Sequence, residues 1–365
     1  MHKDFKKPKK ILIIIQRSNG DVFLSTSLIK SLYENYDAPK IDLLINEDTA
    51  EVAKLLPNIN YIHTFSYQKK ATNRWSQEKE LCSKLFRNYD LSINLTSSDR
   101  SVLYALVASK KSISIVEKDY KKSWWKQKLL SLHYYYDDSR HILIQNLTPL
   151  KLLKIKHDNL QKPIDFSSED FSNIKNILKK KNIHRFIIFH PSAQYNFNVY
   201  PKKLRDKLLN FLNTLELPII ITGGNSEIDL NIKNEIPHLT NIYNFIGETT
   251  LKDYFILSEL AMAYIGMDTL NMHIAASQNK RIFAIFGSTN IAMWSPWSNK
   301  LQTSALINNS LQTFGGITVF QSSFPCETCG KIGCGNSHGK NEFNFIINPE
   351  EIFNEVKKWL IKSEL

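Results

Sequence analysis

Cysteines are scarce in this sequence, and their scarcity narrows the class of protein. The chain of 365 residues has 4 of them, and three lie between residues 326 and 334. Disulfide-stabilised secreted domains carry more cysteines, spread in pairs along a short chain. No long tract of low complexity indicates disorder either. The composition therefore favours a folded protein without a disulfide framework.

Long apolar runs are also missing. No segment reaches the roughly 18 to 20 apolar residues that are needed to span a bilayer. The basic N-terminus is followed by five apolar residues, 11–15. That run is too short for the apolar region of a signal peptide, and no small-residue cleavage site follows it. We therefore expect a cytosolic protein.

Acidic residues are few compared with basic ones. Lys and Arg number 47 against 35 Asp and Glu, which gives a net charge of +12. This excess favours an anionic partner: a nucleotide, a phosphorylated glycan, an anionic membrane surface or a nucleic acid. Two segments concentrate the positive charge, 1–10 and 110–128, and the second also contains Trp124 and Trp125.

Short apolar runs alternate with helical patterns along the first half of the chain. This alternation is typical of βαβ units with a parallel sheet. Because the chain exceeds the usual size of a single core, we expect two domains. The first half has expected strands at 11–15, 41–45, 60–65, 91–95 and 112–116, and expected helices at 22–35, 49–56, 78–87 and 99–109.

The alternation stops in a mostly polar stretch, 154–183, which we interpret as a linker that runs into a helix near 169–180. It then starts again, which predicts two doubly wound domains that bind ligands at the carboxyl ends of their strands and in the cleft between them. The second half has expected strands at 185–190, 218–222, 241–246, 261–265 and 281–286, expected helices at 201–214, 226–234, 251–259 and 269–278, and an amphipathic helix at 349–362.

Asp21 is the first candidate for chemistry. It follows Asn19-Gly20, which we interpret as a tight turn because both residues tolerate positive φ. One interpretation makes Asp21 a plain helix N-cap, for which aspartate is favoured. The other makes it a reactive carboxylate at the mouth of a cleft. The motif alone favours the cap.

Two polar loops of the second half could bind a phosphate. "HPSAQYNFNVYPKK" offers Ser192 and backbone amides after a strand, and "ITGGNSEIDL" offers Gly223-Gly224, where the backbone can approach a ligand. The second loop fits neither the G-x-G-x-x-G fingerprint nor a P-loop, and its Glu227 also suits a helix dipole. Both loops are equally compatible with ordinary connections between a strand and a helix.

The segment "AYIGMDTLNMHIAAS" is the most informative one. Asp268 and Thr269 lie where a helix begins, and His273 lies within its first turns. The free N–H groups and the positive dipole end of a helix suit a diphosphate. Alternatively, Asp268 caps the helix and His273 packs in the core. The next loop, "FGSTNIAMWSPW", is either part of a pocket wall or a packed connection.

Two further segments each allow a functional and a structural interpretation. Cys326, Cys329, Cys334 and His338 fit a tetrahedral structural zinc, or they form a reduced loop without metal. The basic and aromatic segment 121–136 suits a membrane surface or an anionic, partly lipidic acceptor. It is also compatible with a partly buried helix.

Together and in this order, the motifs resemble glycosyltransferase family 9, which contains the lipopolysaccharide heptosyltransferases and has the GT-B fold. The resemblance covers nearly the whole chain and is most specific in "GMDTLNMHIAASQNKRIFAIFGSTNIAMWSPW". Two smaller features, "YDLSINLTSSDRS" and the cysteine segment, resemble the heptosyltransferase III-like subgroup.

The resemblance implies an α/β protein of two Rossmann-like doubly wound domains that face each other across a cleft. An acceptor-binding domain is expected at 1–165 and a nucleotide-sugar-binding domain at 166–348, with the Cys-rich segment 326–338. The remaining residues, 349–365, are expected to form a helix that packs back toward the N-terminal domain.

It also implies inverting transfer of a heptose from ADP-heptose, or of a sugar from another nucleotide-sugar, to the anionic inner core of lipopolysaccharide or lipooligosaccharide. The enzyme would act at the cytoplasmic face of the inner membrane, without nucleic acid. No catalytic cofactor is implied, and the sequence has no D-x-D pair to hold a metal on a diphosphate. Asp21 matches the general base. The other implied site residues bind the donor (Ser192, Asn198, Lys202, Gly223, Gly224, Glu227, Asp268, Thr269, Leu270 and His273) or the acceptor (Arg17, Asn19, Thr96, Ser97 and Arg100).

Two positions depart from the family's motifs. Leu270 stands where the family has the glycine of Asp-Thr-Gly, and Asn198 stands where it has the lysine of Lys-x-Trp-Pro; Lys202 or Lys203 is a candidate replacement. The departures leave open another donor, a weaker activity or a non-catalytic sugar-nucleotide binder. A nucleotide-sugar epimerase or hydrolase is a further alternative. A nucleic-acid binder is disfavoured, because the basic segments lie far from the cysteine cluster in sequence.

Overall fold

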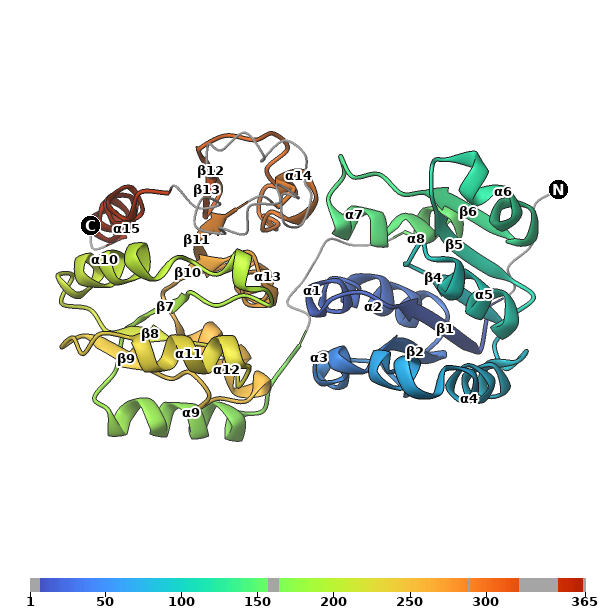
Figure 1. Ribbon diagram of the computed structural model, residues 1–365, viewed down its shortest axis with the longest axis horizontal. Helices are drawn as coiled ribbons and strands as arrows, with labels where there is room; N and C mark the ends of the chain where they lie inside the picture. Colours follow the sequence, from blue (N-terminus) through green and yellow to red (C-terminus); the bar gives the residue numbers. More distant parts are fainter. Residues whose placement is uncertain (1–6, 157–163, 288, 322–346, 364–365) are drawn as a thin grey trace. The chain divides into compact units, whose positions relative to one another are not determined.

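The computed structural model describes residues 7–156, 164–287, 289–321 and 347–363. The chain divides into two compact units, Met1–Ile164 and Asp165–Leu365, called the N-terminal and C-terminal domains below. Figure 1 shows the sheet and the helices of each domain. Among the described helices, none combines the length and the apolar composition needed to cross a membrane.

The N-terminal domain is built on a parallel sheet of six strands in the order β3-β2-β1-β4-β5-β6. On one side of β1 the chain runs to β2 and β3, and on the other side it runs to β4, β5 and β6. The carboxyl ends of β1 and β4 therefore flank the point where the strand order reverses, which is the ligand-binding position of doubly wound sheets. The strands are β1 (Lys10–Ile15), β2 (Lys40–Asn46), β3 (Tyr61–Phe65), β4 (Leu91–Asn94), β5 (Ser112–Val116) and β6 (Leu132–Tyr135).

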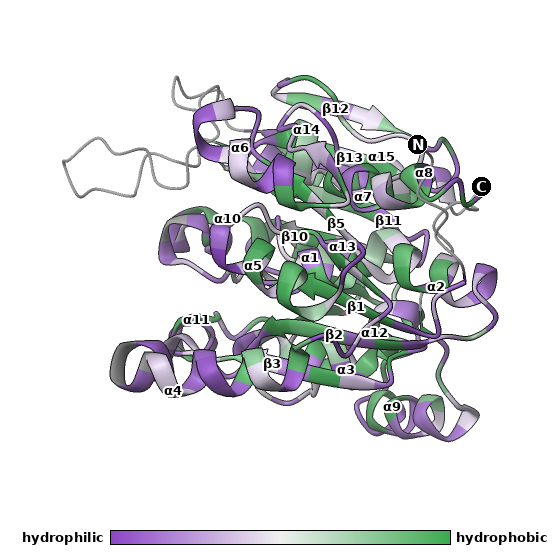
Figure 2. Ribbon diagram, turned by 90° about the vertical axis from the view of Figure 1, so that its right-hand side faces the viewer, coloured by the Kyte–Doolittle hydropathy of each residue, from purple (hydrophilic) through white to green (hydrophobic). Residues whose placement is uncertain are grey.

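Buried apolar runs explain these strands. The segment Ile11–Ile15 is almost completely buried, and Ile41–Ile45 beside it contains one polar residue, Asp42. Strands covered by helices read as continuous hydrophobic runs in this way. Figure 2 colours β1 and β2 as hydrophobic and much of α4 as hydrophilic. The helices are α1 (Asn19–Phe23), α2 (Thr26–Asn35), α3 (Ala50–Leu55), α4 (Tyr67–Leu85), α5 (Asp99–Ala108), α6 (Tyr120–Leu129), α7 (Ile142–Asn146) and α8 (Thr148–Leu152), with a 3₁₀ turn, η1 (Glu47–Thr49).

The C-terminal domain has a seven-stranded sheet in the order β12-β13-β11-β10-β7-β8-β9. β12 pairs antiparallel with β13, and all other neighbours are parallel. The strand order reverses between β7 and β10, so the loops after these two strands occupy the ligand-binding position. The strands are β7 (Ile187–His190), β8 (Ile219–Ile221), β9 (Ile242–Asn244), β10 (Ala263–Met267), β11 (Arg281–Phe286), β12 (Leu311–Phe314) and β13 (Ile317–Gln321).

The helices of this domain include the C-terminal one, α15, which packs on α10. Ile352 and Val356 of α15 lie in the core of the C-terminal domain, and Phe353 stacks on Phe211 of α10 with ring centroids 5.3 Å apart. The apolar face of α15 is buried on α10. The helices are α9 (Ser168–Lys180), α10 (Lys202–Asn213), α11 (Glu227–Glu235), α12 (Leu251–Leu260), α13 (Leu270–Ser277), α14 (Ile291–Trp294) and α15 (Pro349–Ser363), with a 3₁₀ turn, η2 (Asn196–Asn198).

One local expectation was wrong, and the strand β6 and the hairpin of β12 and β13 were not predicted. Asn19 and Gly20 form the first turn of α1 and neither has positive φ, so no tight turn precedes Asp21. The segment 121–136 is divided between α6 and the edge strand β6, because its last residues are aromatic and favour a strand. The hairpin of β12 and β13 was missed, although Gly315, with a φ of 56°, supplies its turn.

Candidate functional site

Asp21 lies at the carboxyl end of β1, as expected, but it is not the helix cap. The N-cap of α1 is Ser18, and Asp21 is the third residue of the helix, with a relative exposure of 3%. The backbone N–H and the hydroxyl of Ser18 donate to Asp21 Oδ2 at 3.2 and 2.7 Å. Arg17 Nε lies 2.8 Å from Asp21 Oδ1. Both carboxylate oxygens are therefore oriented by neighbours.

The residues around Asp21 belong to three elements. Asn46, at the end of β2, donates to the Arg17 carbonyl at 3.1 Å, and the Arg17 guanidinium lies 6.0 Å from the centre of the Tyr136 ring. Thr96, in the loop after β4, accepts a hydrogen bond from the backbone N–H of Gln16 at 3.0 Å. The loops after β1 and β4 thus meet at the reversal point of the sheet, where sequence reasoning placed the acceptor.

Sequence reasoning missed two polar residues of this group. Gln16 and Asn46 are each 6% exposed. Both amide atoms of the Gln16 side chain, and Oδ1 of Asn46, have no hydrogen-bond partner in the described part of the chain. Buried polar atoms are normally paired. These two amides are therefore candidates for binding sugar hydroxyls, and their positions at strand ends were the available signal.

The remaining expected acceptor residues have other contacts. Asn19 is half-buried on α1. The Ser97 carbonyl accepts a hydrogen bond from Lys126 at 2.8 Å. Arg100 lies 3.8 Å from the centre of the Phe65 ring and donates to the Tyr67 hydroxyl at 3.0 Å. These contacts hold Arg100 toward β3 and α4.

In the C-terminal domain, Asp268 directly follows β10 and precedes the start of α13. Burial raises the pKa of its carboxyl to about 7, and a hydrogen bond with the Thr289 side chain partly offsets this rise. Thr269 is the N-cap of α13 and Leu270 is its first residue. Leu270 has no positive φ. The backbone conformation here therefore does not require the glycine of the family motif.

His190 and Asn271 form a second polar group at the same end of the sheet, and sequence reasoning missed both as site residues. His190 ends β7, and its Nδ1 lies 3.1 Å from the Thr222 hydroxyl and 3.0 Å from Asn271 Nδ2. Burial lowers the pKa of His190 to about 4, so its imidazole is neutral at physiological pH. His273, expected to bind the donor, is 4% exposed within α13.

The paired glycines after β8 make room for a protein side chain. A Cβ on Gly223 would lie 2.8 Å from Asp229 Oδ1, and one on Gly224 would lie 3.2 Å from Asp229 Oδ2. Asp229 and Ser226 form the capping box that starts α11, with the Ser226 hydroxyl donating at 2.5 Å. Glu227 is the exposed first residue of this helix.

The loop after β7 carries the other expected donor residues. Ser192 is buried, and Asn198 is half-buried in η2. Lys202, the first residue of α10, is 54% exposed and pairs with Asp206 at 2.7 Å. Lys203 is exposed. The candidate replacement Lys202 is therefore already engaged by a carboxylate.

The expected zinc ligands lie outside the described residues. Cys326, Cys329, Cys334 and His338 all fall in the segment 322–346. Within the described ranges, no group of three or more His, Cys, Asp or Glu side chains is arranged to hold a metal ion.

Comparison with known proteins identifies the family. Residues 74–322 match the family model described as glycosyltransferase family 9 (heptosyltransferase). Lipopolysaccharide heptosyltransferase 3 of Escherichia coli is 26% identical over 297 residues, covering 78% of this chain and 85% of the relative.

Solved structures share the fold. The ADP-heptose lipopolysaccharide heptosyltransferase II of Escherichia coli superposes with a TM-score of 0.69 at 19% identity, covering 98% of this chain and 100% of that one. An Escherichia coli heptosyltransferase solved with ADP gives 0.68 at 12% identity, covering 96% and 99%. The GT-B fold expected from the sequence is thus confirmed. The chain belongs to glycosyltransferase family 9, the heptosyltransferase family, and is a glycosyltransferase of two Rossmann-like domains.

Proposed function

We propose that this enzyme transfers a heptose from ADP-heptose to a sugar hydroxyl of the lipopolysaccharide inner core, with inversion and without a catalytic metal. The observation that carries the proposal is the carboxylate of Asp21, which is buried and oriented by Ser18 and Arg17 at the reversal point of the N-terminal sheet. A base must be fixed within hydrogen-bond reach of the hydroxyl that it deprotonates.

In the proposed reaction, the acceptor oxygen attacks the anomeric carbon of the donor while Asp21 takes the hydroxyl proton. The bond between the anomeric carbon and the diphosphate oxygen breaks, and ADP leaves from the opposite face with the bonding electrons. Such base catalysis contributes ~10²- to 10⁴-fold to the rate. Arg17, beside Asp21, keeps the carboxylate oriented while the proton is transferred.

The donor is proposed to bind at the carboxyl ends of β7 and β10. The first turn of α13, starting at Leu270, supplies backbone N–H groups that suit the diphosphate. Asp268 at this position does not oppose an anion as an ordinary aspartate would, because burial raises the pKa of its carboxyl to about 7. In its protonated form the carboxyl donates a hydrogen bond to a phosphate or sugar oxygen.

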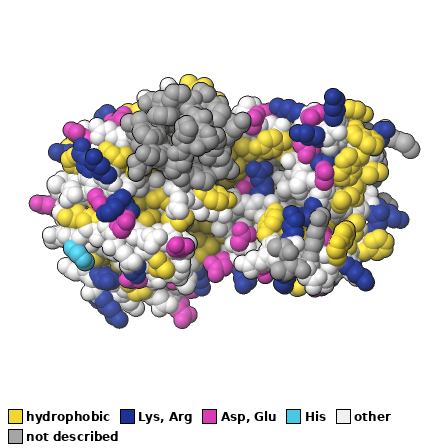
Figure 3. All heavy atoms as spheres, in the orientation of Figure 1, with side chains coloured by type: hydrophobic (Ala, Val, Ile, Leu, Met, Phe, Trp, Pro, Cys, Tyr) yellow, Lys and Arg dark blue, Asp and Glu magenta, His cyan; other side chains and the backbone are white. Residues whose placement is uncertain are grey.

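The acceptor is proposed to be anionic and held at a membrane surface that contacts α6. Tyr120, Trp124 and Leu129 of this helix are 62%, 47% and 61% exposed. Lys121, Lys122 and Lys128 are exposed among them. Figure 3 shows hydrophobic side chains beside Lys and Arg side chains in the region of α6 and β6. Aromatic and basic side chains together suit the interface of an anionic bilayer.

Incubation of the purified chain with ADP-heptose tests the proposed reaction directly. In the presence of a deacylated inner-core oligosaccharide that lacks the added heptose, we expect ADP release and an acceptor heavier by one heptose. Conversion of ADP-heptose without any acceptor would favour a nucleotide-sugar epimerase or hydrolase instead.

A further inference from the structure

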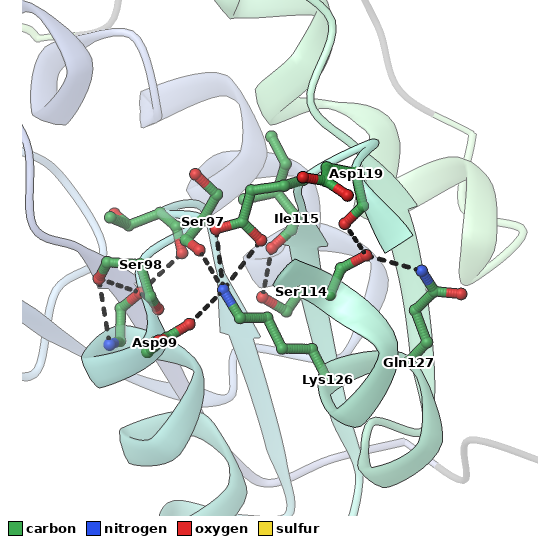
Figure 4. Close-up of polar contacts among 12 residues, drawn as sticks. Ser97, Ser98, Asp99, Ser114, Ile115, Asp119, Lys126 and Gln127 are labelled. Atoms are coloured by element: carbon green, nitrogen blue, oxygen red, sulfur yellow. Dashed lines mark hydrogen bonds and ion pairs between the residues drawn. The ribbon is translucent and has the colours of Figure 1, made fainter. Parts of the chain in front are cut away.

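Lys126 carries a completely buried ammonium group in the N-terminal domain. It lies on the inner face of α6, and its side chain is 0% exposed. Its Nζ lies 2.8 Å from the Ser97 carbonyl, 2.9 Å from both carboxylate oxygens of Glu117 and 2.6 Å from Asp99 Oδ1. Figure 4 shows the ammonium group between these partners. Every proton of the ammonium therefore has an oxygen partner, as a buried charge requires.

The partners of Lys126 come from separate parts of the sheet. Ser97 belongs to the loop after β4, Asp99 is the first residue of α5, and Glu117 directly follows β5. Both carboxylates approach the same ammonium, so without it two negative charges would face each other across the gap. Lys126 thus joins the ends of two neighbouring strands to the start of α5.

The loop that Lys126 holds leads to Asp21 through a short series of contacts. Thr96 immediately precedes Ser97 and is fixed by the Gln16 N–H, which donates to its hydroxyl at 3.0 Å. Gln16 is followed by Arg17, which pairs with Asp21 at 2.8 Å. Residues 96–99, which end the loop after β4 and begin α5, are therefore attached beside Asp21 at one end and to Lys126 at the other.

We propose that Lys126 is a positioning residue for the acceptor. It fixes residues 96–99, so that Thr96 is held beside Gln16 and Asp21, where the acceptor sugar is proposed to bind. The inference rests on the proposed function and deepens it. Stability alone does not account for the cluster, because an apolar cluster of similar volume commonly serves as well as a buried ion cluster.

The substitution Lys126→Met tests the proposal, with Lys118→Met as its matched control. Lys118 is 62% exposed and pairs with Asp137 at 3.3 Å, so its loss removes one charge without touching the loop. For Lys126→Met we expect the KM for the deacylated inner-core oligosaccharide to rise by about tenfold or more. The Kd for ADP-heptose, measured by titration calorimetry, should stay within about twofold of the wild-type value, because the donor binds the other domain.

Hydrogen exchange gives a second measurement that does not depend on transfer. The backbone amides of 97–101 should exchange faster in Lys126→Met than in the wild type and in Lys118→Met. If the wild type does not transfer heptose, the proposed function fails, whereas this exchange still shows whether Lys126 holds residues 97–101 in place. Unchanged exchange in 97–101 would overturn it.

A second variant, which keeps the ammonium group of Lys126, serves if Lys126→Met does not fold. Asp99 is 71% exposed, so Asp99→Asn removes one partner of Lys126 without leaving a buried charge unpaired. If Lys126→Met does not fold, Asp99→Asn takes its place. The positioning role then requires the acceptor KM to rise in Asp99→Asn, by a smaller factor than that expected for Lys126→Met. An acceptor KM within about twofold of the wild-type value, in a folded variant of either kind, contradicts the proposal even if the melting temperature falls.

Discussion

Asp21 and Asp268 are both acids at the start of a helix, yet their surroundings differ. Asp21 is paired with Arg17 and accepts hydrogen bonds from Ser18, so its carboxylate is fixed in place by neighbours. Asp268 is half-buried, and desolvation raises the pKa of its carboxyl to about 7. The two environments suit two roles, an oriented base for the acceptor and a carboxyl that can be neutral beside an anionic donor.

The raised pKa of Asp268 predicts a stability that depends on pH. The unfolded carboxyl ionises near its ordinary value of 3.8, whereas the folded one ionises at about 7. The folded state therefore binds the proton more tightly, and this residue lowers the free energy of unfolding progressively as pH rises through that window. Asp268→Asn removes the effect.

Thermal unfolding of wild type and Asp268→Asn at pH 5 and pH 8 measures this difference. We expect the difference in melting temperature, variant minus wild type, to be larger at pH 8 than at pH 5. If this difference is the same at pH 5 and pH 8, or larger at pH 5, the Asp268 carboxyl ionises in the ordinary range.

Gly223 gives a prediction about packing. Its missing side chain leaves room for the Asp229 carboxylate and for Ile246, which a Cβ would approach to 2.8 and 3.1 Å. Gly223→Ala should therefore disturb the capping box of α11 and lower the free energy of unfolding by about 1–3 kcal/mol. Gly316→Ala is the control, because its nearest neighbour would lie 3.7 Å away. Denaturant unfolding compares the two, and equal stabilities would count against the packing role.

At the scale of single residues, the sequence was sufficient to place Asp21, Thr96 and Asp268 near strand ends. It was not sufficient to find Lys126, because the partners of Lys126 lie 9 to 29 residues away and meet it only in the folded sheet. The role of Ser18 was readable, since Ser18 and Asp21 have the spacing of a capping box.

Among the elements, α6 has two different faces. Lys126 on its inner face is bound to three polar groups, while Trp124 and Lys128 on its outer face are exposed, with Lys128 Nζ lying 5.4 Å from the centre of the Trp124 ring. The sequence showed the basic and aromatic content of this helix. It did not show which lysine is buried, because the helix has no strongly amphipathic pattern to separate the two faces.

The outer face of α6 predicts membrane binding that depends on charge. Replacing Lys121, Lys122 and Lys128 together by Gln should weaken binding to phosphatidylglycerol vesicles by at least about tenfold, because each lysine near an anionic surface contributes roughly 1 kcal/mol. Vesicle sedimentation measures this binding. Trp75→Ala is a control on α4, where Trp75 is 81% exposed. Equal binding of the triple variant and the wild type would place the membrane contact elsewhere.

Helices and long buried strands were the elements most readily predicted. β1 and β2 are buried and read as apolar runs, and β5 is a buried strand in which serine alternates with isoleucine. The expected bounds of all three lie within a residue of the observed ones. The strands β6 and β12 were not predicted from the sequence, because they are short and partly exposed. The packing of α15 on α10 depends on a match between two apolar faces far apart in sequence, which periodicity alone does not reveal.

For the whole molecule, two doubly wound domains could be predicted because the βαβ alternation occurs twice, whereas the GT-B fold was implied by the resemblance of the motifs to the family. In the proposed reaction, the base belongs to the N-terminal domain and the diphosphate-binding site belongs to the C-terminal domain. Because the negative charge of the leaving group is assigned to helix N–H groups and not to a metal, initial rates should be insensitive to chelation. Rates measured with EDTA and with added Mg²⁺ should agree within about twofold; a loss in EDTA that Mg²⁺ restores would contradict this assignment.

The central claim is that Asp21 is the base of a heptosyl transfer, and it is tested most directly by comparing the wild type with Asp21→Asn. Mass spectrometry of the inner-core oligosaccharide after incubation with ADP-heptose gives the rate of heptose addition, and calorimetry gives the Kd for ADP-heptose. The account predicts addition of one heptose by the wild type, a rate ~10²- to 10⁴-fold lower in the variant, and an unchanged Kd. Asp48→Asn, an exposed acid of the same domain, should behave as wild type. A folded Asp21→Asn variant that adds heptose within about tenfold of the wild-type rate would contradict the account.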